Sequence, residues 1–204
     1  MARPRNFDED DVLNTIAEAF WTHGYEGTST RDLVQLTGLT QPSLYNAFGD
    51  KRALFLRALD HYLEHTLRER IERLEATCTP AHAVAGFFRE IVERSVSDEH
   101  RRGCMLVNAA LAAPLEDEAF HELIAKEVEL LRGFFERCLS AAFKSGEIER
   151  MISATDAATS LLAVLLGVRV LARIDPQPKL LVAAVAPTLM LLKLPPMRAK
   201  FATR

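Results

Sequence analysis

The sequence predicts an all-α fold in which a small N-terminal three-helix domain precedes a larger C-terminal helical domain. Apolar residues recur along the chain at three- and four-residue spacing, and only nine Gly and nine Pro interrupt its 204 residues. No stretch alternates apolar and polar residues as a half-buried strand does. With 49% hydrophobic and 26% charged residues, the composition is that of a globular protein. We place the two domains at residues 1–52 and 53–204.

Charge and hydropathy exclude several classes of protein at this stage. The net charge is −3 and the isoelectric point about 6.1, so any site for a polyanion must be a local patch. The apolar runs 157–168 and 180–192 are shorter than the roughly 20 residues that span a bilayer, so no transmembrane helix is expected. The N-terminus lacks the apolar segment of a secretory signal. Three unpaired cysteines fit a reducing cytoplasm.

The first predicted helix begins at a run of acidic residues, Asp8 to Asp11, which the positive end of a helix dipole favours. Val12, Ile16 and Phe20 then form one apolar face. Gly24 is expected to end this helix, because glycine adopts the left-handed backbone of a C-terminal cap without strain.

Two helices of about eight residues follow, at 30–37 and 41–48, and Gly38-Leu39-Thr40 joins them. These are the proportions of a helix-turn-helix. Helices this short are marginal in water, so both must pack on the helices before and after them. The side chains expected to point inward are Leu33 and Leu36 from the first helix, Leu39 from the turn, and Leu44 and Phe48 from the second.

The second short helix is left with an outward face rich in hydrogen-bonding groups. Such groups suit the base edges and phosphate oxygens of a DNA major groove. Residues 31–52 carry a net charge of +1, which allows few phosphate contacts for each subunit and makes dimerisation necessary for useful affinity. Arg3 and Arg5 lie on a possible N-terminal arm. The outward residues are Thr40, Gln41, Ser43, Tyr45 and Asn46, and Thr30 lies at a helix start that can hold a phosphate.

This region resembles the DNA-binding domain of the TetR family of bacterial transcriptional regulators. The resemblance rests on Gly24-Tyr25, Thr28-Ser29, Arg31-Asp32-Leu33, Gly38-Leu39-Thr40, Leu44-Tyr45, Phe48, Lys51 and Leu54-Phe55. It implies a homodimer that binds a palindromic DNA operator and releases it when a small-molecule effector enters the C-terminal domain. It also implies that Thr40, Gln41, Ser43 and Asn46 approach bases, and that Thr30, Tyr45 and Lys51 lie near phosphates. Val34 and Thr37 replace the small alanines usual in the family, and Asn46-Ala47 replaces a bulkier pair, so operator preference does not carry over.

Six helices are expected beyond the short pair. Asp50 can cap the first of them, which runs to Ala76, and Thr79-Pro80 starts the second. Pro187 lies inside the last and is expected to bend or split it. The predicted helices after residue 76 are 80–97, 101–112, 116–145, 154–173 and 176–194.

The last two predicted helices are apolar on nearly all sides, so other surfaces must cover them. A partner subunit is one cover, and the resemblance implies such an interface; burial within the chain is the alternative. Arg169 and Arg173 interrupt the apolar surface. They either bind an anionic effector or pair with carboxylates across the dimer, and we expect the second. The predicted interface residues are Leu161, Leu165, Val168, Val182, Val185 and Leu189.

A small-molecule cavity is predicted among the middle helices, where aromatic residues and methionine occur with a few polar groups, as in many ligand sites. Each residue taken alone is also compatible with plain core. Asn108 is either a polar contact for the effector or a structural hydrogen-bonding group. The predicted lining is Phe88, Cys104, Met105, Asn108, Phe134, Phe135 and Cys138, with Phe87, Ile91, Phe120 and Leu131 as further candidates.

Other functions have weaker support in the sequence. His100 and Cys104, and likewise Cys78 and His82, are four residues apart, but neither pair has a third ligand nearby, so no metal or cofactor is expected. Cys104 is either a reactive thiol near Arg101 and Arg102 or an inert buried one. No phosphate-binding glycine loop or nucleophile elbow is present, so an enzyme is not expected. A purely structural helical bundle is the remaining alternative.

Overall fold

The computed structural model describes residues 7–112 and 117–198, and this part of the chain is helical without strands. The predicted all-α class is therefore confirmed. The helices are α1 (Glu9–Gly27), α2 (Thr30–Thr37), α3 (Gln41–Phe48), α4 (Lys51–Leu63), the π-helical turn η1 (Glu64–Arg68), α5 (Glu69–Thr77), α6 (Pro80–Ser97), α7 (Met105–Ala112), α8 (Glu118–Ser145), α9 (Ala154–Ile174) and α10 (Pro178–Leu191).

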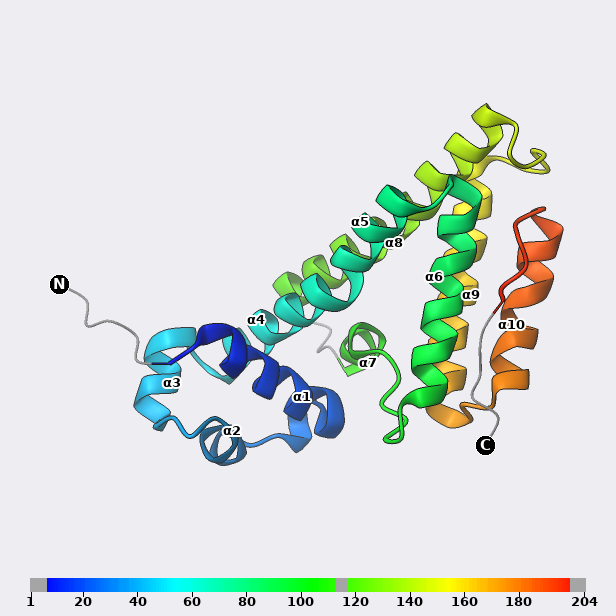
Figure 1. The fold of residues 1–204 in the computed structure, drawn as a ribbon. Helices are drawn as coiled ribbons and strands as arrows, with labels where there is room; N and C mark the ends of the chain where they lie inside the picture. The colour runs from blue at the N-terminus through cyan, green and yellow to red at the C-terminus, as the bar shows by residue number, and fades with distance from the viewer. Residues whose placement is uncertain (1–6, 113–116, 199–204) are drawn as a thin grey trace.

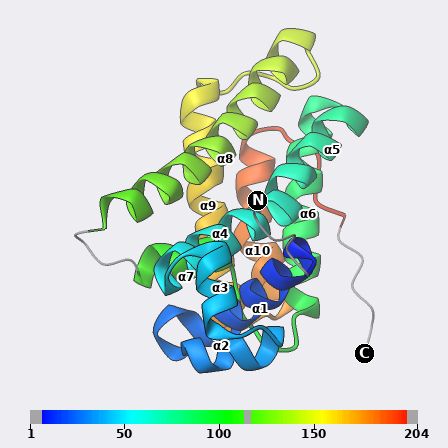
Figure 2. The ribbon, with the colours of Figure 1, turned by 90° about the vertical axis from the view of Figure 1, so that its left-hand side faces the viewer.

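The molecule has a small head and a larger bundle, joined by a rod of consecutive helices (Figure 1). The head consists of α1, α2 and α3, and α4 packs along α1. The rod α4–η1–α5 leads away from the head toward α6, α8, α9 and α10, where α8 packs on α9 and α9 on α10. Figure 1 places α7 between α1 of the head and α6 of the bundle, and α7 contacts both α1 and α8. Figure 2 views the molecule from the side of the head.

The helix starts follow their sequence signals. Asp8 accepts hydrogen bonds from the backbone of Asp10 and Asp11 at 2.9 and 3.2 Å, and Asp50 accepts one from Ala53 at 2.8 Å. Gly24 has the predicted positive φ of 76°, but helix α1 resumes beyond this kink and ends at Gly27. The expectation that Gly24 ends the first helix is therefore wrong by one turn.

Two other expectations about the helices need correction, and for Pro187 one of the two expected outcomes is excluded. The helix predicted from Asp50 to Ala76 contains the π-helical turn η1, in which Arg68 bonds to Glu64 and Asp60 at 2.8 and 2.7 Å and to the fully buried Glu127. The helix predicted at 101–112 begins only at Met105, because Arg101 and Gly103 have positive φ angles of 51° and 74°. Helix α10 remains one helix through Pro187, so it is not split there.

The length argument against a membrane-spanning helix is wrong for α9. Its 21 residues have a mean hydropathy of 1.8 in the most apolar window, which by length and composition alone is enough to cross a membrane. In the structure, one face of α9 belongs to the core of the chain, where Ala157, Leu161 and Val168 are fully buried. Packing of this kind also explains an apolar helix without a membrane.

The predicted dimer residues are mostly part of the chain's own core. The exposed fractions of five of them are too small for a second subunit to cover, at 0% for Leu161, Val168 and Val185, 1% for Leu189 and 3% for Leu165. Val182 alone is half-buried. The reason is that α6 and α8 already cover the inner faces of α9 and α10, so the apolar residues left exposed on these helices are different ones.

Candidate nucleic-acid interface and effector cavities

Helix α3 is only eight residues long, and it is anchored to the head by buried side chains. Leu33 and Leu44 are completely buried and Phe48 is 4% exposed, which confirms their inward orientation. Leu36, however, is 54% exposed, so the expectation that it points inward is wrong. The three leucines of α2 and the turn, at 33, 36 and 39, cannot all face one small core. Leu33 and Leu39 pack against it, and Leu36 faces outward.

The turn between α2 and α3 is fixed by its backbone and by two caps. Gly38 adopts a left-handed conformation with φ of 69°, and its N–H donates to the carbonyl of Val34 at 3.0 Å. Ser29 and Asp32 form a reciprocal capping box at the start of α2. At the start of α3, the Thr40 hydroxyl accepts from the backbone of Ser43 at 3.3 Å and lies 2.9 Å from its hydroxyl. These caps set the angle at which α3 leaves the turn.

The predicted outward face of α3 is exposed, with one exception. Thr40, Gln41, Ser43 and Asn46 are all exposed, as expected for groups that approach bases. Tyr45 is half-buried, and its hydroxyl lies 2.8 Å from the hydroxyl of Thr30 on α2. The Tyr45 side chain therefore ties the two short helices together, and only part of it faces outward. The roles of these residues toward DNA stay predictions.

The positive charge beside α3 is modest. The ammonium of Lys51 lies 4.4 Å from the centre of the Tyr25 ring, which holds it at the start of α4. The neighbouring Arg52 donates two hydrogen bonds to Asp117 at the start of α8, one of them at 2.6 Å. This bonding lowers the pKa of Asp117 to about 2. Arg52 is thus engaged across the junction of head and bundle, and Arg3 and Arg5 lie outside the described residues.

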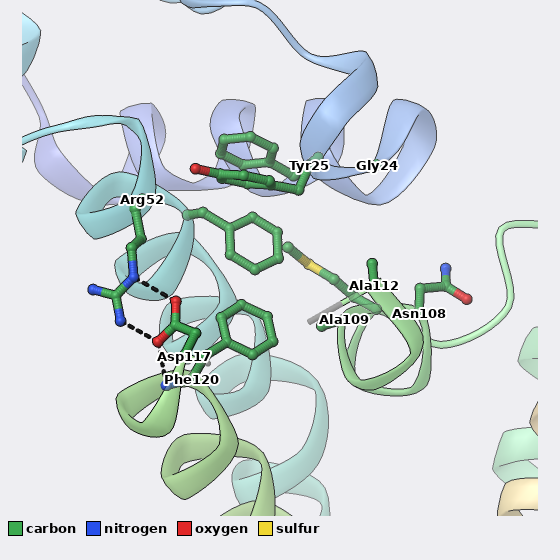
Figure 3. Close-up of a pocket in the computed structure, with 11 residues that line it drawn as sticks. Gly24, Tyr25, Arg52, Asn108, Ala109, Ala112, Asp117 and Phe120 are labelled. Carbon is green, nitrogen blue, oxygen red and sulfur yellow. Dashed lines mark hydrogen bonds and ion pairs between the residues drawn. The ribbon is translucent and has the colours of Figure 1, made fainter. Parts of the chain in front are cut away.

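A first hollow, which we call the junction cavity, lies between the head and the bundle (Figure 3). It measures about 120 Å³, and the Arg52–Asp117 ion pair stands at its edge. Phe55 stacks on Phe120 with ring centres 5.5 Å apart and meets Tyr25 edge-on at 5.2 Å. Of the predicted pocket residues, Met105 and Asn108 line this hollow. The Asn108 amide donates to the carbonyl of Arg102 at 2.8 Å, so it has a structural bond as well.

A second hollow, which we call the central cavity, lies among α4, η1, α5, α6, α7, α8 and α9. It measures about 50 Å³. Of the predicted pocket residues, Cys104 lies in its wall, and the further candidates Phe87, Ile91 and Leu131 also line it. Its polar groups come from Tyr62, Thr66, Arg70, Arg94 and Arg169.

Four predicted pocket residues line neither cavity. Phe88, Phe134 and Phe135 are completely buried in a tight aromatic cluster, where Phe88 stacks on Phe135 at 5.6 Å and Phe134 lies 5.2 Å from Phe135. Cys138 is buried farther along α8, and burial raises the pKa of its thiol to about 12. These residues belong to the hydrophobic core, because in the described part of the chain their side chains are buried and close-packed between helices and leave no hollow beside them to line.

Arg169 lies inside its own chain rather than on a surface open to a partner subunit. Its side chain is turned into the chain, with 6% of the residue exposed, and donates to the hydroxyl of Ser95 at 2.9 Å and to the carbonyl of Gly103. Its Nε is buried and has no hydrogen-bond partner among the residues that the structure describes. Arg173 is exposed at the surface.

Comparison with known proteins decides the family. Residues 12–58 match the model of the bacterial regulatory proteins of the tetR family, and residues 71–186 match the tetracyclin repressor-like C-terminal domain. The chain belongs to the TetR family. It is therefore a DNA-binding transcriptional regulator with a helix-turn-helix head and a helical C-terminal domain.

Individual relatives of this TetR-family protein agree with that assignment. The uncharacterized HTH-type transcriptional regulator YezE of Bacillus subtilis is 34% identical over 148 residues, which are 72% of this chain and 76% of YezE. The HTH-type transcriptional repressor ComR of Escherichia coli is 36% identical over about half of each chain. The structure is similar to that of a cysteine mutant of the TetR family regulator CifR complexed with operator DNA, with a TM-score of 0.81 and 35% identity over 92% of this chain and 98% of CifR.

Sequence reasoning missed most polar residues of the central cavity in this TetR-family protein. Tyr62, Thr66 and Arg70 follow one another at four-residue spacing, which places them on one face of the rod. That spacing was the available signal, but the charged residues between them obscured it. The sequence offers Arg169 as one alternative contact for an anionic effector, but Arg94 could not be placed, because its direction depends on how α6 packs.

The two candidate metal-binding pairs have different surroundings in the fold. Gly103, with its positive φ, separates His100 from Cys104, so the two do not lie on one continuous helix. His82 lies 2.9 Å from the Thr79 hydroxyl and 3.3 Å from the carboxylate of Glu147. In the described ranges, no three His, Cys, Asp or Glu side chains are grouped as metal ligands.

Proposed function

We propose that this TetR-family protein is a ligand-responsive repressor that acts in the cytoplasm as a homodimer. In this proposal, two copies of α3 enter successive major grooves of a palindromic operator, and a small molecule bound in the bundle releases the DNA. The observation that carries the proposal is the exposed polar face of α3, formed by Thr40, Gln41, Ser43 and Asn46 on a helix fixed by two caps and a buried core.

The operator follows from the geometry of a twofold protein. A helix-turn-helix dimer binds half-sites about 34–36 Å apart, one turn of DNA between centres. Thr30, Tyr45 and Lys51 are proposed to contact phosphates, and Thr40, Gln41, Ser43 and Asn46 to contact bases. The relatives support this reading, since CifR is described in complex with operator DNA and ComR as a repressor.

Release by an effector requires that the bundle and the head move together. Helix α4 is the covalent path between them, and two ion pairs add to it: Arg52 with Asp117, and Arg102 with Glu18 of α1. A ligand weakens DNA binding only as far as it prefers the arrangement of heads that does not fit the operator. A change in the bundle that shifts these contacts would alter the spacing of the two α3 helices.

Selection of bound fragments from genomic DNA tests the proposal. We expect enrichment of a palindrome whose half-sites are one helical turn apart, and binding that persists in excess unrelated duplex. Reporter expression should fall when the protein is present, which separates a repressor from an activator. Binding that shows no preference over bulk DNA, or that needs only one half-site, would contradict the proposal.

A further inference from the structure

The wall of the central cavity carries several arginines, and the carboxylates near them do not balance their positive charge. Arg70, Arg94 and Arg169 all line it. Arg70 bonds to Glu90 at 3.2 Å, but Glu90 is shared with Arg73 at 2.6 Å. Among the residues that the structure describes, Arg94 and Arg169 form no ion pair with a carboxylate. The cavity therefore carries a net positive charge in a desolvated place.

Arg169 is the most deeply buried of these guanidinium groups. Its two hydrogen bonds go to neutral acceptors, the Ser95 hydroxyl and the Gly103 carbonyl, and its Nε has none. A buried charge without a counter-charge is costly, and a buried donor without an acceptor adds to that cost. An anion in the cavity would relieve both, because a guanidinium binds carboxylate or phosphate oxygens through several donors at once.

The rest of the wall suits an apolar body. Leu63, Leu67, Phe87, Ile91 and Leu165 surround the cavity, which leaves hydrocarbon on most sides of the arginines. Burial raises the pKa of Tyr62, so its hydroxyl stays protonated and able to donate a hydrogen bond. Pockets of this composition hold the apolar part of a ligand by area and orient it by a few polar groups.

We propose that the central cavity binds an organic anion, in which one carboxylate or phosphate group is attached to an apolar body and is held by Arg94 and Arg169. The binding itself depends only on the cavity. Its regulatory consequence rests on the proposed function, in which this anion is the effector that releases the operator.

Trp21 connects this cavity to the head. It lies on α1, is 5% exposed, and packs against two cavity residues: its ring centre is 5.1 Å from that of Tyr62 and 5.6 Å from the guanidinium of Arg94. A third contact comes from Arg102, whose guanidinium lies 3.9 Å from the same ring. The cavity has room for only a few water molecules, since each needs roughly 10–15 Å³. An anion of several carbons must therefore displace side chains of the wall, and among these Tyr62 and Arg94 are the ones that contact Trp21 of α1.

The single tryptophan makes the test direct, because its fluorescence reports on this contact without DNA. The probes are hexanoate, octanoate and 3-phenylpropanoate, each beside its neutral primary amide, and octyl phosphate beside octanol. We expect at least one anion to change Trp21 emission saturably and to raise the melting temperature. Its neutral analogue should bind at least about tenfold more weakly. Comparing the affinities of the carboxylates with that of octyl phosphate shows which anionic group the arginines prefer.

Variants decide whether the arginines are responsible. Arg94→Met and Arg169→Met should each weaken binding of the active anion by about tenfold or more. Arg132→Met on the surface of α8, where Arg132 pairs with Glu129 and Glu136, is the matched control and should leave it unchanged. Arg94 is half-buried, so its variant serves if the Arg169 variant fails to fold.

The proposal is overturned if none of the anions binds, if the amides bind as well as the acids, or if Arg94→Met binds the anion normally. An operator-binding assay run in parallel separates the two proposals. Anion binding without any operator preference would contradict the proposed function alone. Operator binding without anion binding would contradict this inference alone.

Discussion

Asn46 lies on the exposed face of α3, where its amide can both donate and accept hydrogen bonds. We predict that Asn46→Ala weakens operator binding by about 1–3 kcal/mol, roughly 5- to 150-fold, if the amide reads a base. Stability should change by less than about 0.5 kcal/mol, because the side chain is at the surface. Titration of labelled operator and thermal unfolding measure the two effects. Ser140→Ala, exposed on α8, is the control and should change neither.

Within the part of the chain that the structure describes, the hydroxyls of Tyr45 and Thr30 form the one side-chain bond between α2 and α3, and they lie 2.8 Å apart. Tyr45→Phe and Thr30→Val should each lower the free energy of unfolding by about 0.5–1.5 kcal/mol. The double variant should lose clearly less than the sum, because both changes remove the same bond. Urea unfolding of the four proteins measures this coupling. Strictly additive losses would show that the bond contributes nothing to the fold.

At the scale of the element, the turn between α2 and α3 depends on the backbone of Gly38. No atom of the described residues would lie within 4 Å of a Cβ at this position, so the positive φ of 69° alone disfavours a side chain. Gly38→Ala should destabilise the protein by about 1–2 kcal/mol, and Gly38→Asn by less. Gly133→Ala, in the regular part of α8, is the matched control and should be neutral or stabilising by up to roughly 1 kcal/mol. Chemical denaturation checks the order of the three variants.

The elements that sequence reasoning located correctly are those whose signals are local. Asp50, Thr79-Pro80 and Gly38 mark helix ends by their own backbone chemistry, and the structure has helix ends at each. The π-helical turn η1 is different, because Arg68 there meets Glu127, which lies 59 residues away. The non-helical stretch at Arg101 to Gly103 and the outward turn of Leu36 also depend on neighbours distant in sequence.

The same distinction explains the candidate sites. The polar face of α3 follows from one helix and its period, so it could be predicted. The cavities form where several helices meet, and a phenylalanine such as Phe135 has the same sequence signal whether it lines a hollow or fills one. Only the packing of α8 against α6 shows that it fills one.

At the scale of the whole molecule, the ion pair of Arg52 with Asp117 joins the head to the bundle. The pKa of Asp117 is about 2 in the folded protein and about 3.9 in an unfolded chain, so the ionised carboxyl stabilises the fold. This contribution is complete above pH of about 4 and is lost as the pH falls toward 2. Asp117→Asn keeps the cap on Phe120 but removes the charge. We predict a lower melting temperature than wild type at pH 7, and a gap that narrows below pH of about 4; a constant gap would contradict the ion-pair role.

The proposed dimer needs an apolar surface that the single chain leaves uncovered, and α9 and α10 provide one. On α9, Ala163, Gly167, Val170 and Ile174 share one face, and Leu180 and Met190 are exposed on α10. Met190 is 69% exposed and Ile174 68%. An exposed apolar face of this kind is typical of a surface that another chain covers.

Met190→Glu should therefore yield monomers, because a carboxylate buried at the subunit interface without a partner is costly. The core of each chain should stay intact, since Met190 contributes little to it. Leu165→Glu is a poor test by comparison, because Leu165 is 3% exposed and its loss would unfold the chain itself. Sedimentation velocity and circular dichroism separate the two outcomes, with Leu36→Glu on the head as the control that should remain dimeric. A Met190→Glu protein that sediments as a dimer would place the interface on another face, and a folded monomer that still binds the palindrome tightly would remove the need for a dimer.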